Sequence, residues 1–248
     1  MKKVLLTGAF GNIGPKVIDE LLAQNYQVVC FDLDNKSNRK VSKIYKSKVE
    51  TFWGDITHAE QVTEALAPCD AVIHNAALLP HLVTQNPGLA KKVNVGGTEN
   101  IINAIKASRK NPQLIFPSSI SVHGNHMPED ETPKRINSPF KAEDDYASHK
   151  IACEKILDDC DINWTVMRIG ACLDSNSKIG GEDIKLALQG MFNAHPQCRI
   201  EYVHTKDVAK AQVNAIGNDK AFRKKFFLGG GSCCRSTWHE FNSISFEA

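Results

Sequence analysis

The sequence predicts an α/β fold built on a doubly wound parallel sheet, and three observations point to it. Short apolar runs alternate with amphipathic stretches, which is typical of parallel strands covered by helices on both faces. The first apolar run leads into the pattern Gly8-x-x-Gly11-x-x-Gly14 at the start of an amphipathic stretch. An acidic residue, Asp32, ends the second apolar run.

The elements of the sheet follow one another from the N-terminus. Short, mostly apolar runs predict strands at residues 3–7, 27–32, 48–53, 71–75, 113–118 and 163–168. Apolar residues with helical spacing predict helices between them at 12–24, 58–67, 89–109 and 143–160. Pro68 ends the second of these helices.

The organisation changes after Arg168. A polar loop at 174–181 and an amphipathic stretch at 182–192 come first. A strand at 199–203, a helix at 207–216 and a strand at 226–228 follow. No low-complexity linker sets these segments apart. We therefore predict a nucleotide-binding domain at 1–168 and a small substrate-binding part at 169–248 that is interleaved with it.

Composition and charge exclude several classes of protein. Hydrophobic residues make up 42% of the 248 residues and charged residues 23%, as in folded globular proteins. The net charge of +2 is too balanced for a protein that binds nucleic acid or an anionic membrane. No apolar run approaches the roughly 18 residues of a membrane span, and no signal-peptide cleavage site is evident. The eight cysteines form no C-x-x-C pair, so we expect reduced thiols in a cytoplasmic protein.

The glycine pattern is typical of a dinucleotide-binding loop in a Rossmann fold. Gly8 permits a tight turn, Gly11 lets a pyrophosphate approach the backbone, and Gly14 permits close packing of the helix on the strand. The following helix N-terminus offers N–H groups and partial positive charge to phosphates.

Asp32 decides which dinucleotide is expected. Its carboxylate can accept hydrogen bonds from both hydroxyls of an adenosine ribose and would repel a 2′-phosphate, so we predict NAD rather than NADP. Lys36, Arg39 and Lys40 follow closely and would meet a 2′-phosphate, which keeps NADP open as the alternative. Asp55 either bonds the adenine amino group or serves as a turn residue.

Tyr146 and Lys150 stand four residues apart on a predicted helix and so share one face. A tyrosine titrates near pH 10. A neighbouring ammonium and a positive nicotinamide ring would lower its pKa, so that it takes a proton from a substrate hydroxyl while hydride leaves the carbon. Ser119 follows a strand at the sheet edge where ligands bind, beside Tyr146. A second match, Tyr202 to Lys206, straddles a strand and a helix and should not share a face.

Taken together, these motifs resemble those of the extended short-chain dehydrogenase/reductase superfamily, in the branch of the NAD-dependent epimerases and dehydratases. The matching pieces keep the family's order over residues 1–216: Thr7-Gly8-x-x-Gly11-x-x-Gly14, Asp32, Gly54-Asp55, His74-Asn75-Ala76-Ala77, Asn94-Val-Gly-Gly-Thr98-Glu-Asn100, Ser118-Ser119, Tyr146-x-x-x-Lys150 and Arg168. The resemblance implies that Tyr146 is the acid/base, that Lys150 also holds the nicotinamide ribose, and that Ser119 donates to the substrate oxygen. It further implies a homodimer formed through the two long helices.

The chain departs from the family pattern at several places. Pro117 replaces a usual strand residue, His123 stands where a tyrosine is usual, and the run after Arg168 lacks the family's Asn-Val-Tyr-Gly-Pro-like segment. The sequence also stops shortly after Gly231, where epimerases continue. That run and the short C-terminal part resemble the uronate-type dehydrogenases of the same branch.

The resulting expectation is an NAD-dependent enzyme of the epimerase/dehydratase type that acts on a sugar or nucleotide-sugar hydroxyl. A dehydrogenase or reductase of a sugar acid or small carbonyl compound, and a non-catalytic NAD(H)-binding regulator, are the alternatives. The expected catalytic residues are Ser119, Tyr146 and Lys150. The expected cofactor contacts are Gly8, Phe10, Gly11, Asn12, Ile13, Gly14, Asp32, Asp55, Ile56, Asn75, Ala76, Ala77, Asn94, Tyr146 and Lys150. The expected substrate contacts are Leu79, His81, Ser119, Ser121 and Arg168. His123 and His126 lack a third ligand of suitable spacing, so we expect no metal.

Overall fold

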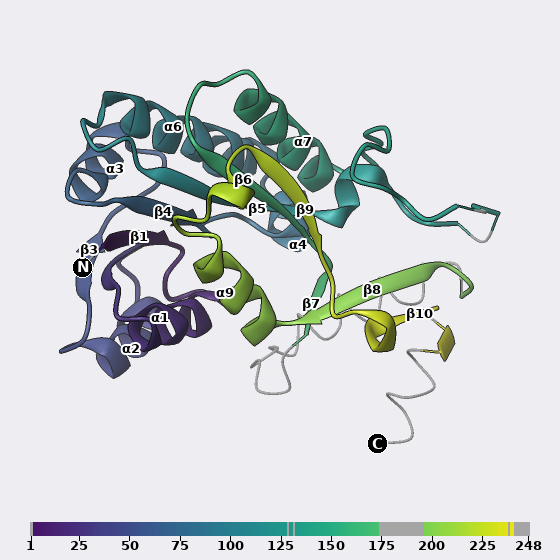
Figure 1. Cartoon of the computed structure of the whole chain (residues 1–248), viewed down its shortest axis with the longest axis horizontal. Helices are drawn as coiled ribbons and strands as arrows, with labels where there is room; N and C mark the ends of the chain where they lie inside the picture. Colours follow the sequence, from purple (N-terminus) through teal and green to yellow (C-terminus); the bar gives the residue numbers. More distant parts are fainter. Residues whose placement is uncertain (1, 128, 131, 174–195, 238, 241–248) are drawn as a thin grey trace.

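The computed structural model describes residues 2–127, 129–130, 132–173, 196–237 and 239–240 (Figure 1). Its main sheet has seven strands in the order β3-β2-β1-β4-β5-β6-β9, and every pairing between them is parallel. The strands are β1 (Lys3–Thr7), β2 (Gln27–Asp32), β3 (Glu50–Trp53), β4 (Ala71–His74), β5 (Gln113–Ser119), β6 (Trp164–Ile169) and β9 (Lys224–Leu228). The predicted doubly wound parallel sheet is confirmed.

Helices cover both faces of this sheet, as Figure 1 shows. One face carries α1 (Gly14–Ala23), α2 (Lys36–Ser42) and α9 (Thr205–Asn214). The other face carries α3 (Ala59–Leu66), α6 (Gly97–Ala107) and α7 (Asp145–Asp158). Because strand side chains alternate between faces, β1 sends Val4 and Leu6 into the first core and Leu5 into the second. Each of these three side chains is fully buried.

The C-terminal segment contributes strands to two sheets. Strand β9 extends the main sheet beside β6, whereas β7 (Ala171–Leu173), β8 (Arg199–His204) and β10 (Arg235–Thr237) form a small sheet in the order β10-β8-β7. Tyr202 lies in β8 and Lys206 in α9, so the second Tyr-x-x-x-Lys match straddles a strand and a helix as predicted. The predicted loop at 174–181 and the stretch at 182–192 lie outside the described residues.

The predicted helix at 89–109 is interrupted. It consists of α5 (Pro87–Lys91), a π-helical turn (Lys92–Gly96) and α6. The Asn94 side chain, in the π turn, accepts a hydrogen bond from Leu78 N at 2.7 Å and donates one to Leu78 O at 3.0 Å. The turn therefore clamps the segment that follows β4, in keeping with the frequent use of π turns near functional sites.

Two short α-helices were not predicted, and the strands β3 and β4 are shorter than predicted. Helix α2 is capped by the Asn35 side chain, which accepts from Asn38 N at 2.9 Å, and α4 (Pro80–Gln85) begins at a proline. Strand β3 begins at Glu50 rather than at residue 48 because the N–H groups of Lys48 and Val49 bond to Tyr45 O and continue the preceding turn.

Pro117 lies in an interior strand of the sheet, and its missing N–H removes no hydrogen bond between strands. The β4–β5 pairing ends at Ile73 and Ile115, whereas β6 remains paired with β5 past Pro117. The missing N–H is therefore not needed on the β4 side. The Pro117 carbonyl accepts a hydrogen bond from Lys150 Nζ at 2.7 Å.

His74 ends β4 inside a fully paired buried network. Thr98 Oγ1 donates to Asn94 O at 2.7 Å and therefore accepts from His74 Nε2 at 3.2 Å. Ala76 N donates to Thr7 Oγ1 at 3.1 Å, and Thr7 Oγ1 donates to His74 Nδ1 at 2.8 Å. This order of donors requires the neutral ring with its proton on Nε2. Burial, with the nearby charge of Lys150, lowers the pKa of His74 to about 3.

The network makes the free energy of unfolding depend on pH. The unfolded chain binds a proton on His74 near pH 6.5 and the folded chain only near pH 3, so the unfolded state holds more protons between these values. Stability contributed by neutral His74 is present above pH 6.5 and falls by about 1.4 kcal/mol per pH unit on acidification below it. The free energy of unfolding, measured by denaturant titration, should fall less between pH 7 and pH 5 in His74→Gln than in the wild type. An equal fall in the two proteins would show that His74 is not held neutral.

Candidate active site

The site lies where the strand order of the main sheet changes direction. Strands β2 and β3 lie on one side of β1, and β4, β5, β6 and β9 lie on the other. Ligands of open α/β sheets bind at this switch point, outside the carboxyl ends of the strands. The glycine loop after β1, Asp32 at the end of β2 and Ser119 at the end of β5 all lie at this edge of the sheet.

The outer two glycines of the loop are required by the fold itself. Gly8 has a φ of +63°, and a Cβ there would lie 2.8 Å from Ala76 N. A Cβ at Gly14 would collide with the Ala9 carbonyl. These two positions therefore keep β1 close to the segment after β4 and keep α1 close to the loop.

Gly11 differs from them because the protein does not require a glycine there. It is exposed, and a Cβ would meet only Gly8 O at 3.4 Å. The structure describes no protein partner for the N–H groups of Asn12 and Ile13, which precede the N-terminus of α1. Open space above a glycine, with free N–H groups at a helix start, fits the phosphates of a dinucleotide.

Asp32 is tied to the glycine loop by its side chain. One carboxylate oxygen accepts from Phe10 N at 2.8 Å, and the other accepts from Leu33 N at 2.8 Å and from Asn38 Nδ2 at 3.0 Å. Burial raises the pKa of Asp32, although these hydrogen bonds oppose the rise. The carboxylate is half-buried at the edge where an adenosine ribose is expected. The sequence analysis missed the role of Asn38. The one sequence feature near it is Asn35, a residue type that favours a helix start, which caps the helix that carries Asn38.

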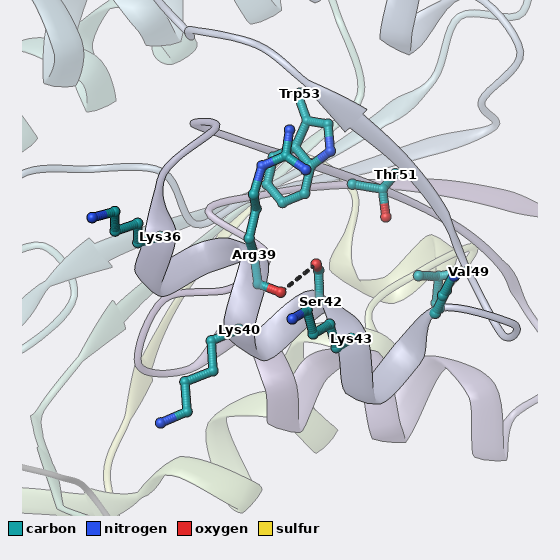
Figure 2. Close-up of a pocket in the computed structure, with 9 residues that line it drawn as sticks. Lys36, Arg39, Lys40, Ser42, Lys43, Val49, Thr51 and Trp53 are labelled. Atoms are coloured by element: carbon teal, nitrogen blue, oxygen red, sulfur yellow. Dashed lines mark hydrogen bonds between the residues drawn. The ribbon is translucent and has the colours of Figure 1, made fainter.

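A basic groove of about 680 Å³ opens between α2 and the edge strand β3 (Figure 2). The Arg39 guanidinium lies 5.4 Å from the centre of the Trp53 ring and is paired with Asp34. Trp53 in turn contacts Phe10 of the glycine loop, with ring centres 5.4 Å apart. Figure 2 shows Lys36 and Lys40 extending away from Trp53. Arg39, the central cation of the NADP alternative, is therefore already engaged by a carboxylate.

Several other predicted cofactor residues are engaged with the protein. Asp55 Oδ1 accepts from Thr57 N at 2.9 Å and from Thr57 Oγ1 at 2.8 Å, as the predicted turn role requires, and the adenine contact of Asp55 stays a prediction. Asn75 and Gln212 of α9 exchange two amide hydrogen bonds, at 2.9 and 3.3 Å. Ile56 is buried against Gly97, whose added Cβ would lie 2.8 Å from it.

Two predicted cofactor residues, Ala76 and Ala77, and the clamp residue Asn94 shape the loop after β4. Asn94 is only 3% exposed, and its side-chain amide bonds to both backbone groups of Leu78. Its observed role is to fix this loop. Ala76 donates its N–H to Thr7 Oγ1, and both alanines are half-buried beside the glycine turn.

Tyr146 and Lys150 share one face of α7, as their spacing predicts. Lys150 Nζ lies 5.7 Å from the centre of the Tyr146 ring and 4.8 Å from that of Phe116. The structure describes no hydrogen bond to the Tyr146 phenol. Burial lowers the pKa of Lys150 to about 8 and raises that of Tyr146 above its usual value. The lowered tyrosine pKa that the sequence predicts depends also on a positive nicotinamide ring, and it stays a prediction.

Ser119 is held by its neighbour Ser121. Its Oγ accepts from Ser121 N at 3.1 Å and from Ser121 Oγ at 2.9 Å. A hydroxyl has two acceptor positions and one donor. With both acceptor positions filled, Ser119 keeps its O–H for donation to another group. Ser121 thus has an orienting role in addition to the substrate contact predicted for it.

Arg168, for which the sequence predicts a substrate contact, is enclosed within the protein. It is 1% exposed and binds Glu154 through Nε at 3.0 Å and Nη2 at 2.7 Å. Its Nη1 donates to His123 Nε2 and to Ile136 O, both at 2.7 Å. All its nitrogens are therefore bound within the protein. His123 is a partner of Arg168 rather than a metal ligand, and burial lowers its pKa.

The remaining predicted substrate residues lie after β4. Leu79, 45% exposed, precedes α4, and the half-buried His81 lies within it. Within the described ranges, no group of three or more His, Cys, Asp or Glu side chains is placed to hold a metal ion. No helix in the same ranges has the length and apolar character needed to cross a membrane.

Comparison with protein families identifies the class to which this fold and site belong. Residues 4–172 match the model of the NAD dependent epimerase/dehydratase family. Because the match covers more than half of the sequence, the chain belongs to this family.

Comparison with curated proteins finds relatives of low sequence identity. The chain is 29% identical over 157 residues to mouse (Mus musculus) 3 beta-hydroxysteroid dehydrogenase type 7, and this alignment covers 62% of the chain and 42% of the relative. It is 27% identical over 206 residues to an uncharacterized epimerase/dehydratase of Staphylococcus aureus strain USA300, and this alignment covers 78% of the chain and 60% of the relative. The chain thus spans about half the length of these two relatives.

A solved structure shares the fold. The UDP-glucose 4-epimerase of Thermus thermophilus, determined in complex with NAD, superposes with a TM-score of 0.81 at 23% identity. The superposition covers 99% of this chain and 82% of that one. At this level of identity the likeness concerns the fold.

Substitution of Gly11 should separate cofactor binding from folding. In Gly11→Ala the added methyl meets no protein atom closer than 3.4 Å, so the free energy of unfolding should stay within about 0.5 kcal/mol of the wild type. The methyl would occupy the space of a pyrophosphate, and NAD binding should weaken about tenfold. Isothermal titration calorimetry checks this. Gly88→Ala is the matched control, because a Cβ there approaches nothing closer than 4.0 Å. NAD affinity equal in both variants would argue against a pyrophosphate at Gly11.

Proposed function

We propose that the protein is an NAD-dependent oxidoreductase of the epimerase/dehydratase type that acts on a sugar or nucleotide-sugar hydroxyl. The observation that carries the proposal is the half-buried Tyr146 phenol, with no hydrogen-bond partner among the described residues and with the Lys150 ammonium 5.7 Å from its ring. The family membership and the glycine loop support NAD as the cofactor.

The chemistry assigns one task to each group. NAD, when bound, supplies the acceptor and donor of hydride. Tyr146 accepts the proton of the substrate hydroxyl. Lys150, whose pKa of about 8 keeps it mostly cationic at pH 7, stabilises the phenolate and offers its ammonium to ribose hydroxyls. Ser119 donates its O–H to the substrate oxygen, because Ser121 fills its acceptor positions.

The adenosine end of the site favours NAD over NADP in this proposal. A 2′-phosphate would approach the carboxylate of Asp32, and Arg39 is already neutralised by Asp34. Lys36 and Lys40 have no described hydrogen-bond or ion-pair partners and would still attract a phosphate, but as exposed ammonium groups they contribute weakly. We also retain a homodimer through α6 and α7, which pack together on one face of the sheet.

Tyr146→Phe is the direct test of this function. Loss of the phenol should lower turnover about 10²- to 10⁴-fold, because general acid–base catalysis disappears. NAD affinity should stay nearly unchanged. Conversion of UDP-glucose would be followed by chromatography that separates nucleotide sugars of equal mass, and oxidation of a free uronic acid by NAD would be followed by the absorbance of NADH. Tyr202→Phe, in the Tyr-x-x-x-Lys match that straddles β8 and α9, is the control and should keep full activity. Undiminished turnover in Tyr146→Phe would remove the tyrosine from the mechanism.

A dehydrogenase of a sugar acid or small carbonyl compound is the second candidate. The turn at residues 119–121 supplies hydroxyl groups but no carboxylate, and loss of water from a sugar needs an acid for the departing hydroxyl. Simple hydride transfer needs only Tyr146, Lys150 and Ser119. A regulator without catalysis would have no use for these three groups together.

The nucleotide that remains on the purified protein distinguishes the two enzymatic candidates. An enzyme that recycles its cofactor in place should release nearly one NAD per chain when it is denatured. A dehydrogenase that exchanges NAD at every turnover should release little, yet bind NAD in a titration. Mass spectrometry of the released nucleotide makes the measurement. Failure to retain or bind either NAD or NADP would contradict both candidates.

A further inference from the structure

A buried contact joins α7 to the end of β5, and the proposed chemistry does not use it. Ser118 Oγ donates to Glu154 Oε1 at 2.6 Å. Ser118 is 3% exposed and Glu154 is 0% exposed. A carboxylate that is fully buried is costly unless it is well paired, so its presence here calls for a physical reason.

The contact lies beside the reacting groups on both elements. Along α7, Tyr146, Lys150 and Glu154 follow one another at intervals of four residues and so form one row on the helix. Along β5, Ser118 stands between Pro117 and Ser119. Lys150 is bound to the Pro117 carbonyl and Glu154 to the Ser118 hydroxyl. Two neighbouring hydrogen bonds therefore fix the helix that carries Tyr146 against the strand end that carries Ser119.

Glu154 is itself held from several sides. Both of its oxygens bind the Arg168 guanidinium of β6, and Lys225 Nζ of β9 lies 3.2 Å from Oε2. Burial raises the pKa of Glu154, but the hydrogen bonds of Arg168 and Ser118 and the charge of Lys225 outweigh it and hold the pKa below the usual value. The carboxylate is thus a fixed, ionised anchor that belongs at once to α7, β5, β6 and β9.

We propose that Ser118 and Glu154 are positioning residues that set the distance between Tyr146 on α7 and Ser119 on β5. This inference rests on the proposed oxidoreductase function. Proton and hydride transfer depend steeply on geometry, and a displacement of about 1 Å can cost about a hundredfold in rate. The pair acts by holding backbone elements in place and touches neither substrate nor cofactor.

Ser118→Ala tests the inference better than a change at Glu154. Glu154→Gln would leave Arg168 and Lys225 without their buried counter-charge and can fail to fold. Ser118→Ala removes one hydrogen bond and leaves the Glu154–Arg168 pair intact. The control is Thr165→Val, which removes another buried hydroxyl from the same sheet. This hydroxyl donates to Ala221 O at 2.8 Å and accepts from Gln113 Nε2 at 3.2 Å, three residues along β6 from Arg168.

Thr165→Val should lose at least as much stability as Ser118→Ala, since it removes two buried hydrogen bonds rather than one, and the two variants should differ in catalysis. We expect Ser118→Ala to lower kcat about tenfold, with KM and NAD affinity within about twofold and an unchanged pH profile of kcat. Thr165→Val should keep the kcat of the wild type. Substrates are UDP-glucose and a free uronic acid with NAD, and melting temperatures are recorded for each variant.

Each outcome bears on one claim. Equal kcat in Ser118→Ala and Thr165→Val, with Tyr146→Phe inactive, would overturn the positioning role and leave the proposed function standing. A raised KM with unchanged kcat in Ser118→Ala would also overturn it, since that pattern belongs to binding. If the wild type converts none of these substrates, the proposed function fails and this inference fails with it.

Discussion

The close approach of β1 to the segment after β4 is the constraint on which the site depends. Gly8 leaves no room for a side chain against Ala76, and Thr7 binds both Ala76 and His74. Because the strand order reverses between these two strands, their carboxyl ends diverge toward helices on opposite faces. The N–H groups before α1, the Asp32 carboxylate and the loop that Asn94 holds at Leu78 all follow strand ends at this edge of the sheet.

Two buried polar networks support this edge of the sheet by different physical means. The one around His74 is neutral, and each donor has one acceptor, so its order depends on a single protonation state. The one around Glu154 is charged and balances one carboxylate against Arg168 and Lys225. The neutral network fixes the loops that would receive the cofactor. The charged network ties the helix of Tyr146 to the sheet.

The fold was predictable because parallel strands buried on both faces leave continuous apolar runs, and the spacing of Tyr146 and Lys150 was enough to place both on one helix face. Other features depend on partners distant in sequence. Nothing near Arg168 in the chain reveals that Glu154 and His123 will enclose it, so the sequence predicts a substrate contact where the structure has a buried ion pair. The π turn at Asn94 likewise arises from its bond to Leu78, sixteen residues earlier, and no local periodicity records that bond.

The hydrogen bond between Lys150 and the Pro117 carbonyl bears on when Tyr146 can accept a proton. The Lys150 ammonium donates to a backbone oxygen, and burial raises the pKa of the neighbouring Tyr146 phenol. Under the proposed mechanism, ribose hydroxyls compete with that oxygen for the same donor, and the positive ring arrives together with them. Under this proposal, proton abstraction by Tyr146 depends on NAD being bound, because the cofactor supplies both the competing hydroxyls and the positive ring.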